Sequence, residues 1–151
     1  MQVSAKADYA LRALSELAAA GGGPLKGGQL ASSQSIPPKF LENILIELRH
    51  AGIVHSQRGA EGGYRLARPA DRINLAEILR AVDGPLANVR GLRPEEVVYD
   101  GSASHLVEVW IAVRASLRSV LETITLQGLV DGELPKGVVT LTDDPESWKP
   151  H

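Results

Sequence analysis

The chain has 151 residues, of which 44% are hydrophobic, 23% are charged and 4% are aromatic, and its formal net charge is −2. This composition predicts one globular domain with an aliphatic core, and the lack of a secretory leader or long apolar run predicts a cytoplasmic protein without membrane attachment. Because the sequence contains no cysteine, it excludes disulfides, thiolate metal sites, cysteine nucleophiles and ordinary iron–sulfur ligation.

The charges are distributed unevenly along the chain. Residues 1–84 contain ten Lys and Arg against eight Asp and Glu, a balance of +2, whereas residues 85–151 contain six against ten, a balance of −4. A surface that binds a polyanion is therefore expected in the first part of the chain.

The first helix is predicted over residues 3–20. Its apolar residues recur at the spacing of one helical face, and three glycines followed by a proline end it. The predicted face consists of Leu11, Leu14, Leu17 and Ala18. A short second helix is predicted from Gln29 to Ser33.

The segment "IPPKFLENILIELRHAG" predicts the clearest helix. Pro37 and Pro38 suit its first turn, where a missing N–H group costs nothing, and Gly52 suits its end. The stripe predicted to be buried is Leu41, Ile44, Leu45 and Leu48. Two helices joined by a tight turn, the second opening with polar side chains, are typical of a helix-turn-helix.

A β-hairpin is predicted next, because "IVHSQ" and "GYRLAR" are short apolar-polar segments on either side of "RGAEG". A hairpin directly after a helix-turn-helix indicates a winged helix. "NLAEILRAVDGP" then predicts a helix that begins with the cap pair Asn74 and Glu77 and ends at Gly84. We therefore assign a winged helix-turn-helix domain to residues 1–84.

The second part of the chain has a different pattern. Residues 85–103 lack periodicity and are expected to form a loop, and a helix is predicted over residues 104–127. This helix either packs on its own domain or pairs with a second copy about a two-fold axis, and its heptad spacing favours a homodimer. The predicted seam is Leu106, Trp110, Val113, Leu117, Val120 and Ile124. The acidic tail, 128–151, is expected to be partly mobile, and its "VVTLT" could add a strand.

A mainly α fold of this kind, with a small β-hairpin and a long C-terminal dimerisation helix, would bind duplex DNA through the first turn of its recognition helix. Lys39 and Asn43 are expected to donate hydrogen bonds to bases or phosphates. Glu42 can only accept, and the exocyclic amine of cytosine is the usual partner for a carboxylate; alternatively, Glu42 is a solvated carboxylate on the helix surface.

The hairpin would bind the neighbouring DNA backbone or minor groove. Arg58 is expected to enter the narrow minor groove, where negative potential is concentrated. Gly59 would let the hairpin tip approach the sugar-phosphate backbone. Arg65 and Arg68 are expected to support Arg58 electrostatically.

Two stretches, "IPPKFLENILIELRHAGIVHSQRGAEGGYRLAR" and "INLAEILRAVDGP", resemble the winged-helix regulators that include the IscR-type, NsrR-type and CymR-type repressors. The resemblance covers about residues 1–127. It implies a homodimer on a palindromic operator, in which the long helix crosses the partner and packs on the partner's first helix. It also implies that Glu42 and Arg58 read DNA, although Ala60 and Glu61 replace a Pro-Gly pair that is frequent at the wing tip.

The loop over residues 85–103 lies at the position of the family's sensor and departs from the family pattern. Cluster-binding members carry three cysteines in the loop before the long helix, whereas the loop here has none. Asp8 falls where NsrR-type proteins use an aspartate ligand from the partner subunit, but one carboxylate cannot hold a cluster without thiolates or imidazoles. We therefore expect no metal or other cofactor, and we interpret Asp8 as a first-turn residue stabilised by the helix N-terminus.

What replaces the cluster is open at this point. A small molecule could bind between the first helix and the partner's long helix, around Asp8, Tyr9, Arg12 and Trp110. Another protein could bind there instead, or the protein could act without an effector.

The leading hypothesis is a homodimeric, sequence-specific DNA-binding transcriptional repressor without an iron–sulfur cluster. The alternative is a winged-helix module that binds protein rather than DNA, which the net charge of −2 and Glu61 favour. The sequence predicts no enzyme, because it shows no nucleophile–base set, phosphate-cradling loop or metal-spaced cluster.

Overall fold

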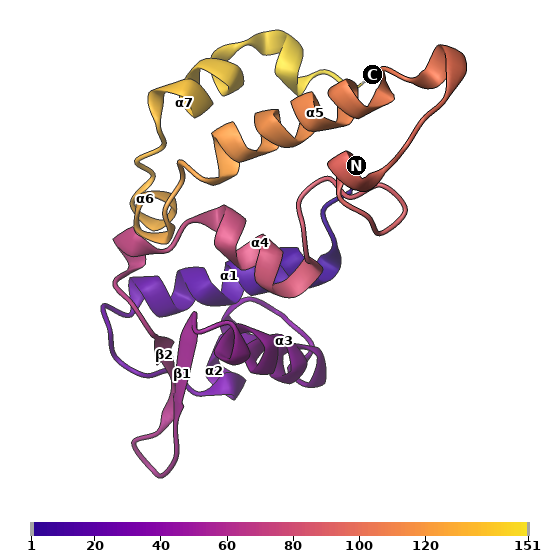
Figure 1. The fold of residues 1–151 in the computed structure, drawn as a ribbon. Coiled ribbons are helices and arrows are strands. Elements are labelled where there is room, and N and C mark those ends of the chain that lie inside the picture. Colours follow the sequence, from indigo (N-terminus) through magenta and orange to yellow (C-terminus); the bar gives the residue numbers. More distant parts are fainter. Residues whose placement is uncertain (1, 151) are drawn as a thin grey trace.

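The computed structural model describes residues 2–150, which form α-helices and one β-hairpin (Figure 1). The helices are α1 (Ala5–Ala19), α2 (Gly27–Ser33), α3 (Pro38–His50), α4 (Leu75–Asp83), α5 (Leu106–Leu121), α6 (Leu126–Asp131) and α7 (Lys136–Asp143). The strands are β1 (Val54–Gln57) and β2 (Gly63–Leu66), and short 3-10 turns lie at Ala70–Arg72, Pro94–Glu96, Gly101–Ala103 and Pro145–Trp148. The predicted fold class, mainly α with a small β-hairpin and a long C-terminal helix, is confirmed.

Helix α1 lies at the centre of the fold and packs against α2, α3, α4, α6 and β2. It begins where the Ser4 side chain accepts a hydrogen bond of 2.9 Å from the Ala7 backbone N–H, which is the usual N-cap arrangement. Alanines on its buried face let neighbouring helices approach closely, and Leu14 and Leu17 fill the space between them.

Helices α2 and α3 form the predicted helix-turn-helix. The turn passes through Ser35, whose φ is +53°, and is closed by a 2.9 Å hydrogen bond from the Ile36 N–H to the Ala31 carbonyl. Pro38 occupies the first turn of α3, and Gly52 follows its end with a φ of +71°. The predicted stripe is buried, which confirms the assignment: Leu41, Ile44, Leu45 and Leu48.

Strands β1 and β2 pair antiparallel, with Val54 opposite Leu66 and Gln57 opposite Gly63. Two further hydrogen bonds, of 2.9 and 2.7 Å, join Leu25 to Tyr64, so a single residue from the preceding loop extends the sheet. Figure 1 shows the hairpin projecting away from the helices as a free wing.

Helix α4 has the predicted capping box. The Glu77 N–H donates to Asn74 Oδ1 at 3.0 Å, and the Asn74 N–H donates to Glu77 Oε1 at 3.3 Å. Gly84, with a φ of +83°, ends the helix. No helix within residues 2–150 is both long enough and apolar enough to cross a lipid bilayer.

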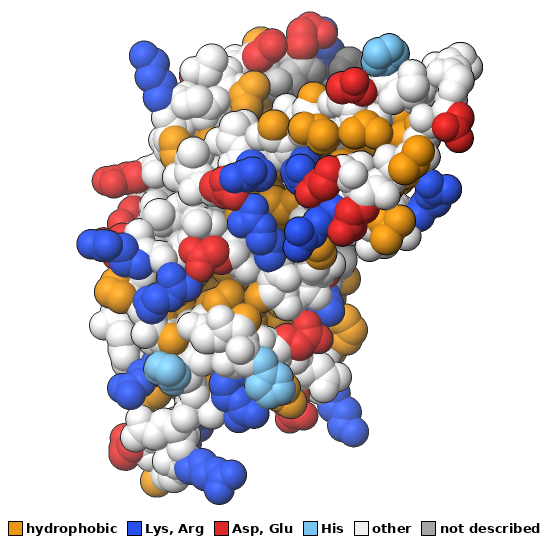
Figure 2. All heavy atoms as spheres, viewed as in Figure 1, with side chains coloured by type: hydrophobic (Ala, Val, Ile, Leu, Met, Phe, Trp, Pro, Cys, Tyr) orange, Lys and Arg blue, Asp and Glu red, His pale blue; other side chains and the backbone are white. Residues whose placement is uncertain are grey.

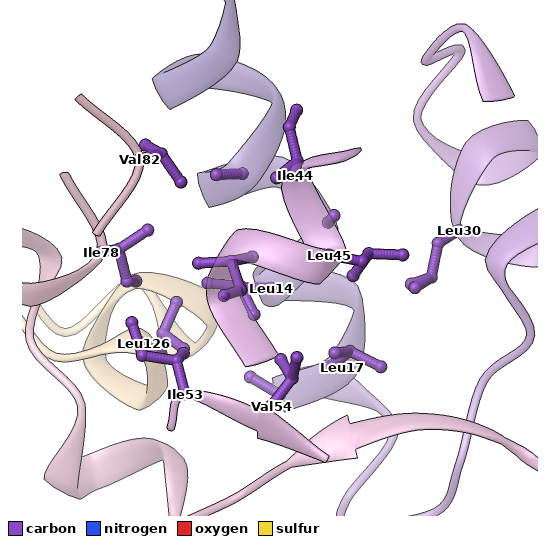
Figure 3. Packing of buried hydrophobic residues seen from close by; sticks show 14 of the residues in the cluster. Leu14, Leu17, Leu30, Ile44, Leu45, Ile53, Val54, Ile78, Val82 and Leu126 are labelled. Atoms are coloured by element: carbon purple, nitrogen blue, oxygen red, sulfur yellow. The ribbon is translucent and has the colours of Figure 1, made fainter. Parts of the chain in front are cut away.

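The hydrophobic core lies among α1, α3, α4, the base of the hairpin and α6. Figure 3 shows Leu14 at its middle, with Ile78 on the α4 side, Leu45 and Leu30 on the other, and Val54 beneath. Leu126 of α6 belongs to the same cluster. The C-terminal segment therefore completes the core of the winged-helix domain.

The predicted helix over residues 104–127 is shorter than expected, because α5 ends at Leu121. Thr125 instead caps α6 by accepting a 3.0 Å hydrogen bond from the Gly128 N–H. The segment between the helices pairs with the chain before α4: the Leu75 N–H donates to the Ile124 carbonyl at 3.0 Å. Ile124 is buried in the core of its own chain, so its predicted place in a dimer seam is wrong.

The tail is also helical at the segment for which the sequence pattern allowed a strand. "VVTLT" lies in α7, which begins directly after Pro135, a residue suited to a helix start. The β-branched residues of this segment suggested a strand, but such residues favour a strand only where a sheet edge is present for it to pair with. The predicted mobility of the tail stays a prediction.

Candidate nucleic-acid interface

The outer face of α3 carries the three residues predicted to contact bases. Lys39, Glu42 and Asn43 are all exposed, on the side opposite the buried leucine stripe. One helical turn further along this face lies Ile46, whose side chain is 41% exposed although it is large and apolar. The heptad and stripe patterns gave no reason to select Ile46. In a major groove it could contact the methyl group of thymine.

Arg58 lies at the first position of the loop between β1 and β2 and is exposed. Among the residues that the structure describes, its guanidinium has no ion-pair or hydrogen-bond partner. Its positive charge is therefore available to a ligand. Figure 2 shows more basic than acidic side chains on the lower part of the molecule, where the wing projects.

The wing glycines are required by the protein's own backbone. A Cβ atom on Gly62 would lie 2.3 Å from the Gln57 carbonyl oxygen, and one on Gly63 would lie 2.5 Å from the Leu25 carbonyl oxygen. Only Gly59, with a φ of +102°, has open space around it. Gly62 and Gly63 therefore shape the hairpin and its contact with Leu25, and of the three wing glycines only Gly59 remains a candidate for close approach to DNA.

The two arginines predicted to support the wing differ in their surroundings. Arg65 is exposed on β2, opposite His55. Arg68 forms an ion pair of 2.7 Å with Glu77 and donates a 3.0 Å hydrogen bond to the Arg72 carbonyl. Arg68 therefore joins the base of the wing to α4, and a neighbouring carboxylate compensates much of its charge.

Three of the four residues predicted around an effector lie together on α1 and its surroundings. Arg12 pairs with Asp8 at 3.1 Å, lies over the Tyr9 ring at 5.4 Å and also donates to Gln34. Trp110 lies elsewhere in the chain, where its indole N–H donates to the Tyr99 hydroxyl at 3.0 Å. The prediction placed this pocket between α1 and the partner's long helix, so it stays a prediction.

Helix α5 shows a large apolar surface. None of its sixteen residues, all of them described, is buried within the chain. Val113, Leu117 and Val120 line an open groove of about 1140 Å³, whose opposite wall includes Leu11 and Leu79. Leu106 at the start of the helix is exposed, and so are Val109 and Ile111 outside the seam.

Within residues 2–150, no three His, Asp or Glu side chains converge as metal ligands would. In the loop before α5, Glu95 is paired with Arg114 at 2.6 Å, and Glu96 accepts a 2.8 Å hydrogen bond from the Arg93 N–H. These carboxylates, together with the absence of cysteine, do not suit an iron or iron–sulfur centre.

The sequence is similar to those of known transcriptional regulators. Residues 3–132 match the Rrf2 family, described as an iron-dependent transcriptional regulator. Rv1287 of Mycobacterium tuberculosis (strain H37Rv) is 50% identical over 145 residues, which cover 95% of this chain and 90% of that protein. Its provisional name is that of an HTH-type transcriptional regulator. CymR of Bacillus subtilis, named an HTH-type transcriptional regulator, is 36% identical over 137 residues, covering 88% of this chain and 94% of CymR.

Solved structures agree with these sequence matches. The structure of CymR, the global cysteine regulator of B. subtilis, has a TM-score of 0.74 at 34% identity and covers 87% of this chain and 98% of that one. IscR of T. potens has a TM-score of 0.68 at 31% identity and covers 100% and 93%. The winged-helix fold and the predicted resemblance are confirmed, and the relatives are regulators rather than enzymes.

Proposed function

Because the chain belongs to the Rrf2 family of DNA-binding transcriptional regulators, we propose that it is a homodimeric repressor that recognises a palindromic operator. The observation that carries this proposal is the position of an exposed polar face on α3 beside a wing whose arginine is free to bind a ligand. These two surfaces come from adjacent elements of the chain. A protein that contacts the major groove and the neighbouring minor groove or backbone at once needs its two contact surfaces to lie side by side.

Base recognition is assigned to α3. Lys39 and Asn43 donate hydrogen bonds, and Glu42 accepts one from the exocyclic amine of cytosine. Lys39 lies one residue from the start of the helix, where the side chains of a recognition helix approach the base edges.

Minor-groove or backbone contact is assigned to Arg58. Its exposed guanidinium is displayed by a hairpin that Gly62, Gly63 and the pairing with Leu25 keep in shape. Arg68 holds the base of this hairpin against Glu77 of α4. A DNA contact at the wing is thereby fixed relative to α3.

Dimerisation is assigned to α5. None of the sixteen residues of α5 is buried within the chain, so its apolar side chains are exposed to water in a single chain. Covering this surface with a partner is favourable. A second copy of α5 would cover Val113, Leu117 and the groove beside them. Two chains related by a two-fold axis would then present two wings and two α3 helices to the two halves of a palindrome.

We derive no iron-dependent step for this chain. The family description names iron, but the loop before α5 offers no thiolate, and two of its three carboxylates, those of Glu95 and Glu96, are engaged with Arg114 and the backbone. The regulator is therefore proposed to work without an iron–sulfur cluster, and the effector site around Tyr9 and Arg12 stays a prediction.

The test begins with selection of bound fragments from genomic DNA, followed by fluorescence anisotropy on the selected operator. Arg58→Ala should weaken binding about tenfold or more, because a charge-assisted contact contributes about 1.5–3 kcal/mol. Arg90→Ala is the matched control, since Arg90 is an exposed loop arginine outside the interface. Equal affinities for the wild type and Arg58→Ala would remove the wing from the mechanism.

A further inference from the structure

Four arginines line one pocket between the winged-helix domain and α5. The pocket has a volume of about 490 Å³, and its basic walls are Arg80 of α4, Arg93 of the loop, and Arg114 and Arg118 of α5. Figure 2 shows basic and acidic side chains gathered on the face between α4 and α5. None of these residues belongs to the proposed DNA interface.

This gathering of arginines is unexpected in its part of the chain. Residues 85–151 are acidic overall and contain only six Lys and Arg. Three of those six, Arg93, Arg114 and Arg118, line this single pocket. Mutual repulsion would disperse them unless something compensates their charge.

Two glutamates supply part of that compensation. Glu122 Oε1 accepts from both Arg80 at 2.5 Å and Arg118 at 3.0 Å. Glu95 pairs with Arg114 at 2.6 Å. Hydrogen bonds from these arginines lower the pKa of Glu122, and the backbone and Arg114 lower the pKa of Glu95, so both stay ionised at neutral pH.

The compensation is incomplete in charge and in hydrogen bonding. The four arginines and the two glutamates that pair with them leave a formal excess of +2, and Glu96 accepts only from the Arg93 backbone N–H. Each guanidinium has five N–H donors, and each arginine paired with a glutamate uses only part of this capacity. Arg93 forms no ion pair with any residue from 2 to 150, although it lines the pocket.

We infer that this pocket binds a small phosphorylated molecule. A phosphate monoester carries a charge near −2 at neutral pH and offers three acceptor oxygens, which matches the excess charge and the free donors. Guanidinium groups bind such oxygens in forked pairs. Pro85 and Leu86, which also line the pocket, provide an apolar surface for the rest of the molecule.

The position of the pocket suggests what such a ligand would do. It would join α4 of the winged-helix domain to α5, and the segment Gly84 to Leu86 separates it from the apolar groove of α5. A bound dianion would therefore fix α5 relative to the DNA-binding domain. This regulatory consequence rests on the proposed function, whereas ligand binding itself does not.

The test is calorimetric titration of the full chain, without DNA, using inorganic phosphate and glucose 6-phosphate at constant ionic strength, with glucose as the uncharged reference. Saturable binding of the two phosphates but not of glucose is expected. Arg93→Gln should weaken it about tenfold, because one charge-assisted interaction is lost. Arg90→Gln is the matched control, since it removes the same charge from the same loop outside the pocket.

Two further variants make the test decisive. Arg114→Gln combined with Glu95→Gln removes the ion pair as a unit, avoids an unpaired carboxylate and should also weaken binding. Arg58→Ala should leave binding unchanged, which distinguishes this pocket from the DNA interface. Absence of saturable binding, equal affinity in Arg93→Gln and Arg90→Gln, or loss in Arg58→Ala would overturn the inference.

Discussion

The winged-helix domain and α5 bury their apolar residues to very different degrees. In the first, α1, α3 and α4 each contribute several buried side chains to one core, which α6 completes. In the second, a helix with comparable apolar content has none. The first region buries its core within one chain, whereas the second exposes an apolar surface, which the proposed second copy would cover.

The largest expected effect is in the core. Leu45→Ala should lower the free energy of unfolding by about 2–5 kcal/mol, because it opens a cavity in a packed interior. Ile111→Ala in α5, where the side chain is 39% exposed and lies outside the groove, should cost about 1 kcal/mol or less. Urea unfolding at one protein concentration measures both. Similar costs at the two sites would contradict the proposed difference between the regions.

The next effect concerns association. Leu117→Glu should weaken dimerisation about 100-fold or more, because a charge would be placed in an apolar contact. Its circular dichroism should stay that of the wild type, since Leu117 is not part of the core of the chain. Native mass spectrometry over a dilution series measures the effect, with Ser119→Glu as the control on an exposed position of the same helix. A dimer that tolerates Leu117→Glu would locate the interface elsewhere.

A smaller effect is expected at the base of the wing. Gly63→Ala should cost about 2–3 kcal/mol, because Gly63 has a φ of +148° and its new Cβ would meet the Leu25 carbonyl. Gly59→Ala meets no neighbour and should cost about 1 kcal/mol from backbone strain alone. Thermal unfolding of the two variants ranks them. The reverse order would show that the pairing with Leu25 does not shape the hairpin.

The smallest effect is a pH dependence at the junction of the two regions. Hydrogen bonds from Arg80 and Arg118 lower the pKa of Glu122 below its ordinary value of 4.5. Its contribution to stability is therefore present above pH 4.5 and is lost as the pH falls through the lowered pKa. Glu122→Gln should make the decline in melting temperature in this acidic range shallower. An unchanged slope would show that the ion pairs are too exposed to matter.

The winged-helix domain could be predicted well from the sequence, because the patterns that indicate its elements each lie within a single helix or strand. The stripe from Leu41 to Leu48 and the cap pair Asn74 and Glu77 lie within single elements, so periodicity and capping are enough to find them. Ile124 was misassigned because the heptad spacing continues beyond Leu121, where α5 ends, up to Thr125, which caps α6. Spacing alone cannot show that a chain turns back into its own core.

The features that were missed depend on tertiary contacts. Arg68 meets Glu77 only because the hairpin returns to α4. The arginine pocket likewise joins α4, the loop and α5, which are far apart in sequence. The position of Trp110 against Tyr99 has the same origin. No periodicity or motif indicates such long-range contacts. The exposure of the candidate DNA-contact residues on α3 and the wing could therefore be predicted, whereas their tertiary surroundings could not.

The most direct test of the central claim, that a second copy covers α5, is sedimentation equilibrium of the wild-type chain at micromolar concentration. The proposed function predicts a mass close to twice the 16.1 kDa of one chain, and two chains on each operator duplex when DNA is added. A single-chain mass that persists at this concentration, with one chain for each duplex, would contradict it.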